Sequence, residues 1–302
     1  MECRQELPKV SFVIPTFNSA RTIGRCLESV AKQDYSNLEI VVIDGGSKDA
    51  TIHECSKFTD KVFIENGPLG KARQTGVEKS TGDILAIFDS DIILPSPYWL
   101  QQAIKPFQKH ENIGVVWPVN RAPSNGSIVA KCYFGFWNER LLETKNALPG
   151  GNSLISREAV ERVGGFNTRV HFGEDFDLIN RILCSGYKVA VFRWPIIHDS
   201  MHTLKVYTRK QMWGASSLLK TKSTPGDSDL LYQCITWDAS NQRSSRGAVL
   251  KGIVTSQIIG GFKSMIFGMA KRKQLALAIF PLLLCIRTGV YGLYFARMIA
   301  SR

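Results

Sequence analysis

The chain has 302 residues, 44% of them hydrophobic, which suits one large α/β domain or a domain with an appendage. The sequence has no internal repeats or low-complexity tracts, which excludes a solenoid and a disordered protein. The net charge of +12 lies almost wholly in residues 239–302, which hold ten Lys and Arg and no Asp or Glu. We therefore expect an anionic partner for this tail, either a membrane or nucleic acid.

Four short apolar runs in the first third of the chain are rich in β-branched residues and predict buried strands. They lie at 10–15, 38–43, 61–65 and 83–88. Apolar residues at helical spacing predict helices between them, one through Ile23, Leu27 and Val30 and another at 70–80. This alternation is typical of βαβ units, so we expect an α/β fold with a mostly parallel sheet.

Polar residues follow three of these strands, namely Thr16, Asp44 and Asp89. Ligands of open α/β sheets bind at the carboxyl ends of the strands, so we expect these three residues to meet in one crevice.

The middle of the chain is mixed in character. A glycine turn at 150–153 precedes a short strand at 154–155 and a helix at 157–163, which Gly164-Gly165 ends. A second helix at 175–184 and a strand at 188–192 follow.

The last third of the chain has a different pattern. Residues 221–247 are polar and predict a linker or mobile loop. Two apolar segments follow, at 248–270 and 275–300, and each reaches the length of a membrane span only by including a charged residue. They are therefore expected to be interfacial helices, a re-entrant hairpin or weak spans, with a helical hairpin packed on the catalytic domain as the alternative.

Small sequence features bear on the compartment and on the kind of site. Seven dispersed cysteines form no CxxC pair, which argues against zinc and favours reduced thiols in a cytosolic setting. The first residues have no apolar run after their charges, so no signal peptide is expected.

Asp89-Ser90-Asp91 places two carboxylates at the end of a predicted buried strand. Mg²⁺ and Mn²⁺ prefer oxygen ligands and are commonly held by one or two carboxylates together with substrate phosphates. A cation at this point would stabilise the charge that develops on a departing diphosphate. A solvated turn is the plainer interpretation of the same triplet.

Five stretches of the sequence, in order, resemble the family 2 glycosyltransferases, which are inverting enzymes with a GT-A fold. They are VSFVIPTFNSARTIGRCLESV, LEIVVIDGGSKDAT, GKARQTGVEKSTGDILAIFDSD, GGNSLISREAVERVGGFNT and GEDFDLINRILCSGYKV. The resemblance covers residues 9 to about 215 and implies a Rossmann-like central sheet flanked by helices, in a catalytic domain at 1–220. Residues 248–302 would then be a helical, membrane-associating appendage.

The resemblance implies donor-side roles for eight residues, with the metal and diphosphate at the Asp-Ser-Asp triplet. They are Pro15, Thr16 and Asn18 in the first nucleotide loop, Asp44 at the base, Gly70 and Arg73 in the next loop, and Asp89 and Ser90. Asp89 and Asp91 would hold the cation, Mn²⁺ or Mg²⁺. The family commonly has a second acid where this chain has Gly45, and Gln74 stands where Asn is usual.

Acceptor-side roles are implied further along the chain. Asp175 matches the family's general base, and Glu174 precedes it in an acidic pair that would otherwise only cap the following helix. Gly150, Gly151 and Asn152 match the acceptor-side loop.

A histidine that faces the metal or diphosphate in many relatives corresponds to His198. His202 competes for that role, and a structural histidine is the alternative for each.

These observations predict an inverting transferase that moves a sugar from a UDP-sugar, or else a GDP-sugar, to a hydroxyl or phosphate of a lipid-linked acceptor. We expect it at the cytoplasmic face of the cell membrane, peripheral or monotopic or with C-terminal transmembrane helices, bound to an anionic lipid surface. Nucleic acid is not an expected partner, since no recognised motif accompanies the basic charge. A catalytically silent nucleotide-sugar-binding subunit and a sugar nucleotidyltransferase are the alternatives.

Overall fold

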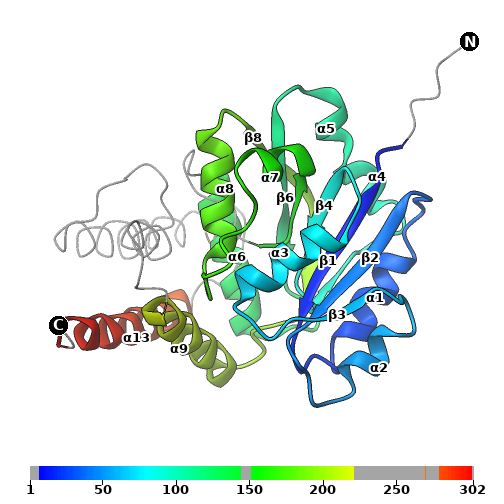
Figure 1. Cartoon of the computed structure of the whole chain (residues 1–302). Helices are drawn as coiled ribbons and strands as arrows, with labels where there is room; N and C mark the ends of the chain where they lie inside the picture. Colours follow the sequence, from blue (N-terminus) through cyan, green and yellow to red (C-terminus); the bar gives the residue numbers. More distant parts are fainter. Residues whose placement is uncertain (1–6, 144–150, 221–268, 270–278, 301–302) are drawn as a thin grey trace, which may run out of the picture. The chain divides into compact units, whose positions relative to one another are not determined.

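The computed structural model describes residues 7–143, 151–220, 269 and 279–300 (Figure 1). The chain divides into two compact units. Unit 1 comprises Met1–Val119, Gly150–Arg169 and Asp177–Ile196, and unit 2 comprises Asn120–Pro149, Val170–Phe176 and Ile197–Arg302. The predicted linker at 221–247 lies outside the described residues.

An eight-stranded sheet carries unit 1, with the strand order β3-β2-β1-β4-β7-β6-β8-β5. The strands are β1 (Val10–Thr16), β2 (Leu38–Asp44), β3 (Val62–Ile64), β4 (Ile84–Ile87), β5 (Ile92–Ile93), β6 (Ile113–Arg121), β7 (Ser153–Ser156) and β8 (Lys188–His198). The first four strands are the four that the sequence predicts, within two residues at each end.

The direction of the strands changes across the sheet. β1 runs parallel to β2 and β4, and β2 runs parallel to β3, as expected for βαβ units. β7 instead runs antiparallel to both β4 and β6. The sheet is therefore mixed, and the expectation of a mostly parallel sheet holds for its first four strands.

Two strands differ from expectation in the middle of the chain. β6 was not predicted, although Ile113–Trp117 is an apolar run like those that predict β1 and β2. β8 continues six residues beyond the predicted end at 192 and reaches His198. In this added part the side chains of Ile196 and His198, two residues apart on one face, are buried.

Helices of unit 1 lie against the sheet and supply apolar faces to the core. They are α1 (Ile23–Ala31), α2 (Thr51–Cys55), α3 (Leu69–Lys79), α4 (Trp99–Ala103), α5 (Lys105–Lys109), α7 (Arg157–Arg162) and most of α8 (Glu174–Cys184). Buried Ile23, Leu27 and Val30 recur every three to four residues on α1 and form one face of that helix. Edge-to-face aromatic pairs join Phe12 to Phe88 at 5.6 Å and Phe88 to Trp99 at 6.0 Å.

A buried carboxylate ties the amino ends of the strands together. Glu39 accepts hydrogen bonds from Ser11 Oγ, Lys61 Nζ and the Thr81 N–H, each at 2.6 Å. Burial by itself raises the pKa of Glu39, but these hydrogen bonds outweigh it and lower the pKa to about 2. This network lies at the opposite end of β2 from Asp44.

The described part of unit 2 includes the long helices α6 (Ile128–Glu143), α9 (Leu204–Lys220) and α13 (Phe280–Ala300). α13 packs along α9: Tyr207 donates to the Leu283 carbonyl at 3.0 Å, and Arg287 donates to Gln211 Oε1 at 2.7 Å. The Arg287 guanidinium is buried and also lies 4.7 Å from the centre of the Tyr291 ring. The charged residue in the middle of this apolar segment thus contacts side chains inside unit 2.

The structure describes only part of the predicted tail, namely Met269 and residues 279–300. Within the described part of the chain, no helix combines the length and the apolar character needed to cross a membrane. The five cysteines that are described (Cys26, Cys55, Cys132, Cys184 and Cys285) are free thiols.

Candidate functional site

The ends of β1 and β2 lie side by side in unit 1. Thr16 is the register partner of Asp44, and the Gly45 N–H donates to the Thr16 carbonyl at 2.8 Å. β4 is the other neighbour of β1, so Asp89, two residues past its end, leaves the same edge of the sheet. The register thus places the three strand ends at one edge of the sheet, as predicted.

The loops after β1 and β2 are fastened to each other. The Asn18 N–H donates to Ser47 Oγ at 2.7 Å, and Asn18 Oδ1 accepts from the Lys48 N–H at 2.9 Å. Asn18 has a φ of 48°, a left-handed conformation that asparagine tolerates better than most residues. The two predicted nucleotide loops therefore form one joined surface.

Asp44 is fully buried, and both of its carboxylate oxygens serve the turn that follows it. Oδ2 accepts from the Gly46 and Ser47 N–H groups at 2.8 and 2.7 Å, and Oδ1 accepts from Ser47 Oγ at 2.5 Å. Contact with a donor base stays a prediction for this residue. What the structure assigns to Asp44 is the shape of the turn.

Gly70 and Arg73 lie on the first turns of α3 and are buried. The Arg73 side chain is only 2% exposed and donates to Asp89 Oδ1 at 3.1 Å. Two of the predicted donor-side residues, Arg73 on α3 and Asp89 after β4, are therefore in direct contact. The structure also places Ser90 Oγ 3.0 Å from Ser19 Oγ, next to the first loop.

Asp89 has a second partner, Asn152. Asn152 Oδ1 accepts from the Asp89 N–H at 2.7 Å, and Asn152 Nδ2 donates to Asp89 Oδ2 at 3.2 Å. The Asn152 side chain is buried, and its φ is 65°. The acceptor role expected of Asn152 and Gly151 is not tested by these contacts, and Gly150 lies outside the described residues.

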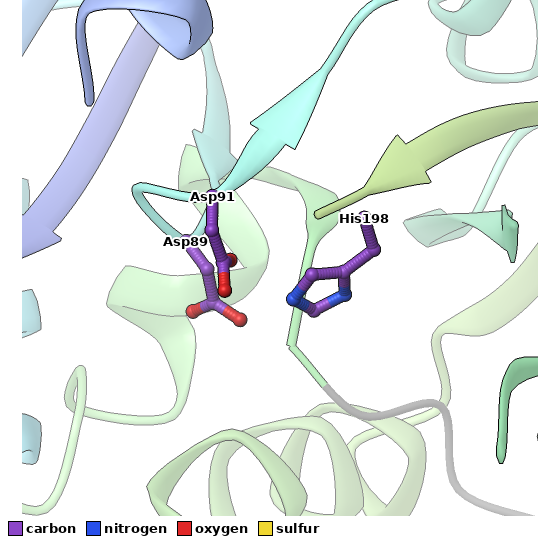
Figure 2. Close-up of side chains that lie close together, drawn as sticks. All are labelled: Asp89, Asp91 and His198. Atoms are coloured by element: carbon purple, nitrogen blue, oxygen red, sulfur yellow. The ribbon is translucent and has the colours of Figure 1, made fainter. Parts of the chain in front are cut away.

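A group of three side chains can hold a cation. Asp89, Asp91 and His198 each offer one ligand atom, and these atoms all lie within 4.8 Å of one another. Figure 2 shows both carboxylates turned toward the imidazole. His198 is the last residue of β8, and the first nine residues of that strand belong to unit 1. The two carboxylates supply oxygen ligands of the kind that Mn²⁺ and Mg²⁺ prefer, so the residues fit the predicted ion.

His198 is held in place by an aromatic neighbour in unit 2. Its ring stacks on Phe134 with the centroids 4.8 Å apart, and the histidine is 6% exposed. The competing His202 instead has its Nε2 3.0 Å from the Asp199 carbonyl and 3.3 Å from Asp199 Oδ1. The structure thus favours His198 over His202 as the ligand.

Glu174 and Asp175 begin α8, as expected, and belong to unit 2. Glu174 is buried, whereas Asp175 is partly exposed and its Oδ1 accepts from the Phe176 N–H at 2.8 Å. This bond fits a carboxylate at a helix N-terminus. The general-base role of Asp175 stays a prediction.

Two residues near the site, Phe17 and Phe134, were not predicted from the sequence. Phe17, between Thr16 and Asn18, is 60% exposed. An aromatic residue inside a polar turn is the signal that could have marked it. The stacking of Phe134 on His198 has no local signal, because the two residues are 64 positions apart in a region without clear periodicity. Gln74, which stands where the family usually has Asn, accepts from the Phe166 N–H at 2.8 Å and so holds the loop after α7.

The chain matches known proteins over most of its length. The model of the family "Glycosyl transferase family 2" matches residues 11–164, which is half of the chain, and "N-terminal domain of galactosyltransferase" matches residues 140–205. Glycosyltransferase AglE of Haloferax volcanii is 32% identical over 196 residues, which are 61% of this chain and 64% of that protein. The chain therefore spans less than two thirds of this relative.

Solved structures share the fold. A mannosyltransferase from Pyrobaculum calidifontis, in complex with GDP-Man and Mn²⁺, superposes with a TM-score of 0.64 at 20% identity, over 96% of this chain and 88% of that one. Residues 1–349 of TarS from S. aureus, in complex with UDP-GlcNAc, give 0.53 at 16% identity, over 95% and 92%. With the mixed sheet and its flanking helices, this likeness identifies a GT-A-type fold. By its family match and its fold, the chain belongs to glycosyl transferase family 2.

Proposed function

We propose that this chain transfers a sugar from a nucleotide-sugar donor, with inversion, using a divalent cation at Asp89, Asp91 and His198. The observation that carries the proposal is the convergence of these three ligand atoms within 4.8 Å, at the end of β4 and beside the joined loops of β1 and β2. When bound, the cation would stabilise the negative charge on the departing diphosphate.

Other residues of the chain would contact the donor or position the residues that do. The joined loop surface with Thr16, Asn18 and exposed Phe17 would receive the nucleoside. Gly70 lets the donor approach the α3 backbone closely, and Arg73 fixes Asp89. Each of these groups binds or orients the donor.

The reaction forms one bond and breaks another at the anomeric carbon of the sugar. The acceptor oxygen attacks that carbon, the bond from the carbon to the diphosphate oxygen breaks, and the nucleoside diphosphate leaves. Asp175 takes the proton of an acceptor hydroxyl as attack proceeds. A phosphate acceptor arrives deprotonated, so Asp175 would then matter less.

The donor is a UDP-sugar or a GDP-sugar. Relatives of this fold are known with either type of donor: the mannosyltransferase with GDP-Man and TarS with UDP-GlcNAc. Gly45 stands where the family commonly has a second acid, so the family pattern at this loop does not indicate which base the donor carries.

The acceptor is lipid-linked, and the protein works at an anionic membrane surface on the cytoplasmic side. Support comes from the acid-free, basic tail and from α9, where exposed Leu204, Met212 and Trp213 lie among exposed Lys205 and Arg209. Apolar and basic side chains on one helix face are typical of interfacial helices.

A panel of UDP- and GDP-sugars, incubated with Mn²⁺ and a lipid extract, tests the proposal. We expect release of UDP or GDP together with a labelled lipid, and loss of both products by at least about 100-fold in Asp89→Asn and in Asp175→Asn. Asp60→Asn, an exposed carboxylate on unit 1, is the control and should keep full activity.

Other products would contradict the proposal. In a parallel incubation with a nucleoside triphosphate and a sugar 1-phosphate, release of pyrophosphate would identify a sugar nucleotidyltransferase. Donor binding without turnover in any combination of donor and acceptor would identify a silent binding subunit. Wild-type rates in Asp175→Asn alone would point to a phosphate acceptor.

A further inference from the structure

Strand pairing brings Asn152 to the cation site from a distant part of the sequence. β7 runs antiparallel to β4, and Ser153 is the register partner of Ile87. The residue before Ser153 must therefore lie next to the residues that follow Ile87. Asn152 and Asp89 become neighbours in unit 1 although 63 positions separate them.

The amide of Asn152 can lie in only one orientation against Asp89. The backbone N–H of Asp89 only donates, so the group that faces it at 2.7 Å must be the amide oxygen. The amide nitrogen then faces the Asp89 carboxylate, to which it donates at 3.2 Å. The Asn152 side chain thus accepts a hydrogen bond from the Asp89 main-chain N–H and also orients the Asp89 carboxylate.

Arg73 holds the other oxygen of that carboxylate. Its Nη2 donates to Oδ1 at 3.1 Å, whereas Asn152 donates to Oδ2. Both donors are buried, with Arg73 2% and Asn152 3% exposed, while the Asp89 side chain is 32% exposed. Two buried donors on opposite oxygens leave the carboxylate little freedom to rotate.

We propose that Asn152 is a positioning residue for the cation site, which orients the Asp89 carboxylate toward the ion. The role rests on the proposed function in one respect, that a cation is bound at Asp89. It differs from the acceptor contact that the glycine-rich loop before Asn152 suggests. Exchange of outer partners of metal ligands commonly costs about 10- to 100-fold in metal affinity.

Asn152→Gly tests this role without straining the backbone. The φ of 65° suits glycine, so the variant removes the amide and keeps the conformation. Asn112→Gly is the matched control, because Asn112 has a φ of 67°, is exposed and lies at the start of β6. Mn²⁺ affinity, measured by titration calorimetry alone, with UDP and with GDP, should fall by about tenfold or more in Asn152→Gly and stay unchanged in Asn112→Gly.

Asn152→Asp is the second variant. Its effect on Mn²⁺ binding should be opposite to that of Asn152→Gly. It keeps an acceptor for the Asp89 N–H but sets a negative charge against the carboxylate. We expect a lower melting temperature without metal and a larger Mn²⁺-induced rise than in the unmodified protein.

Wild-type Mn²⁺ affinity in Asn152→Gly would overturn the positioning role, whatever its transferase activity. Should that variant fail to fold, an unchanged Mn²⁺-induced rise in Asn152→Asp would overturn the role instead. If the unmodified protein binds no Mn²⁺ alone, with UDP or with GDP, the cation itself is refuted, and the proposed function fails with it. Mn²⁺ binding without sugar transfer would refute the function alone.

Discussion

At the scale of single residues, two aspartates that follow neighbouring strands have different tasks. Asp44 is buried, and its oxygens accept from backbone and hydroxyl groups of its own turn. Asp89 is partly exposed and is held by the side chains of Arg73 and Asn152. The sequence has an aspartate at both places. Only the contacts of the two side chains distinguish the residue that shapes a loop from the residue that can bind an ion.

The consecutive glycines after α7 offer a matched pair of variants. Gly164 and Gly165 have φ values of 78° and 75°, so alanine at either position should cost about 1 kcal/mol in backbone strain. A Cβ at 164 meets nothing within 4 Å, but a Cβ at Gly165 would come within 2.3 Å of Gln74 Oε1. Gly165→Ala should therefore lose the Gln74 bond to the Phe166 N–H as well and cost about 1 kcal/mol more.

Urea unfolding of both glycine variants checks this expectation. Equal losses of unfolding free energy would show that Gln74 does not hold the loop.

Glu39 makes stability depend on pH. Its pKa is about 2 in the folded protein, against an ordinary value of 4.5, so its contribution is fully present above pH 4.5 and is lost as the pH falls toward 2. Glu39→Gln should flatten the decline of unfolding free energy between pH 4.5 and 2. At neutral pH it should cost about 2 kcal/mol, because charged hydrogen bonds are lost.

The measurement for Glu39 is urea unfolding at a series of pH values. Glu28→Gln is a suitable control, since Glu28 is half-exposed and paired only with Lys32 among the contacts described. A slope unchanged by Glu39→Gln would refute the assignment.

At the scale of elements, the pattern of apolar residues predicts those strands and helices that depend on the local sequence alone. The strands from Val10 to Ile87 and helix α3 lie within two residues of their expected bounds, because each is a short apolar run that ends in turn residues. β6, the antiparallel direction of β7 and the length of β8 were not predicted. Strand direction depends on pairing with distant strands, and no local pattern carries that information. For the same reason the contact between Asn152 and Asp89 was not predicted, because it follows from the register of β7 on β4.

The pairing of α9 with α13 gives a prediction at this scale. Gln211 is buried and accepts from the Arg287 guanidinium, so Gln211→Ala removes a hydrogen bond to a buried charge. We expect a loss of about 2 kcal/mol in unfolding free energy. Met212→Ala changes the next residue, which is exposed, and should cost less than about 0.5 kcal/mol. Equal melting temperatures for the two variants would contradict the packing of α13 on α9.

At the scale of the whole molecule, charge is divided along the chain. Residues 239–302 carry +10, which leaves +2 for the rest. If the tail meets an anionic membrane, the protein should co-sediment with vesicles of phosphatidylglycerol and not with vesicles of phosphatidylcholine alone. Binding should fall in about 1 M salt, where the screening length is about 3 Å.

Two triple variants separate the tail from the general surface. Lys271, Arg272 and Lys273 changed to Gln should weaken vesicle binding severalfold, at about 1 kcal/mol for each charge near the surface. The same change at Lys105, Lys109 and Lys188, which are exposed on unit 1, removes as much charge and should have little effect. Equal losses would show that only net charge matters.

The division into units has a consequence for how the chain can be cut. The chain passes between the two units five times, so neither unit is one continuous piece of sequence. A fragment of residues 1–220, the expected catalytic domain, would keep α9 but lose α13, and with it the partners of Tyr207 and Gln211. A stop codon after residue 220 would therefore uncover a buried face of α9, and such a fragment should aggregate where the intact chain does not.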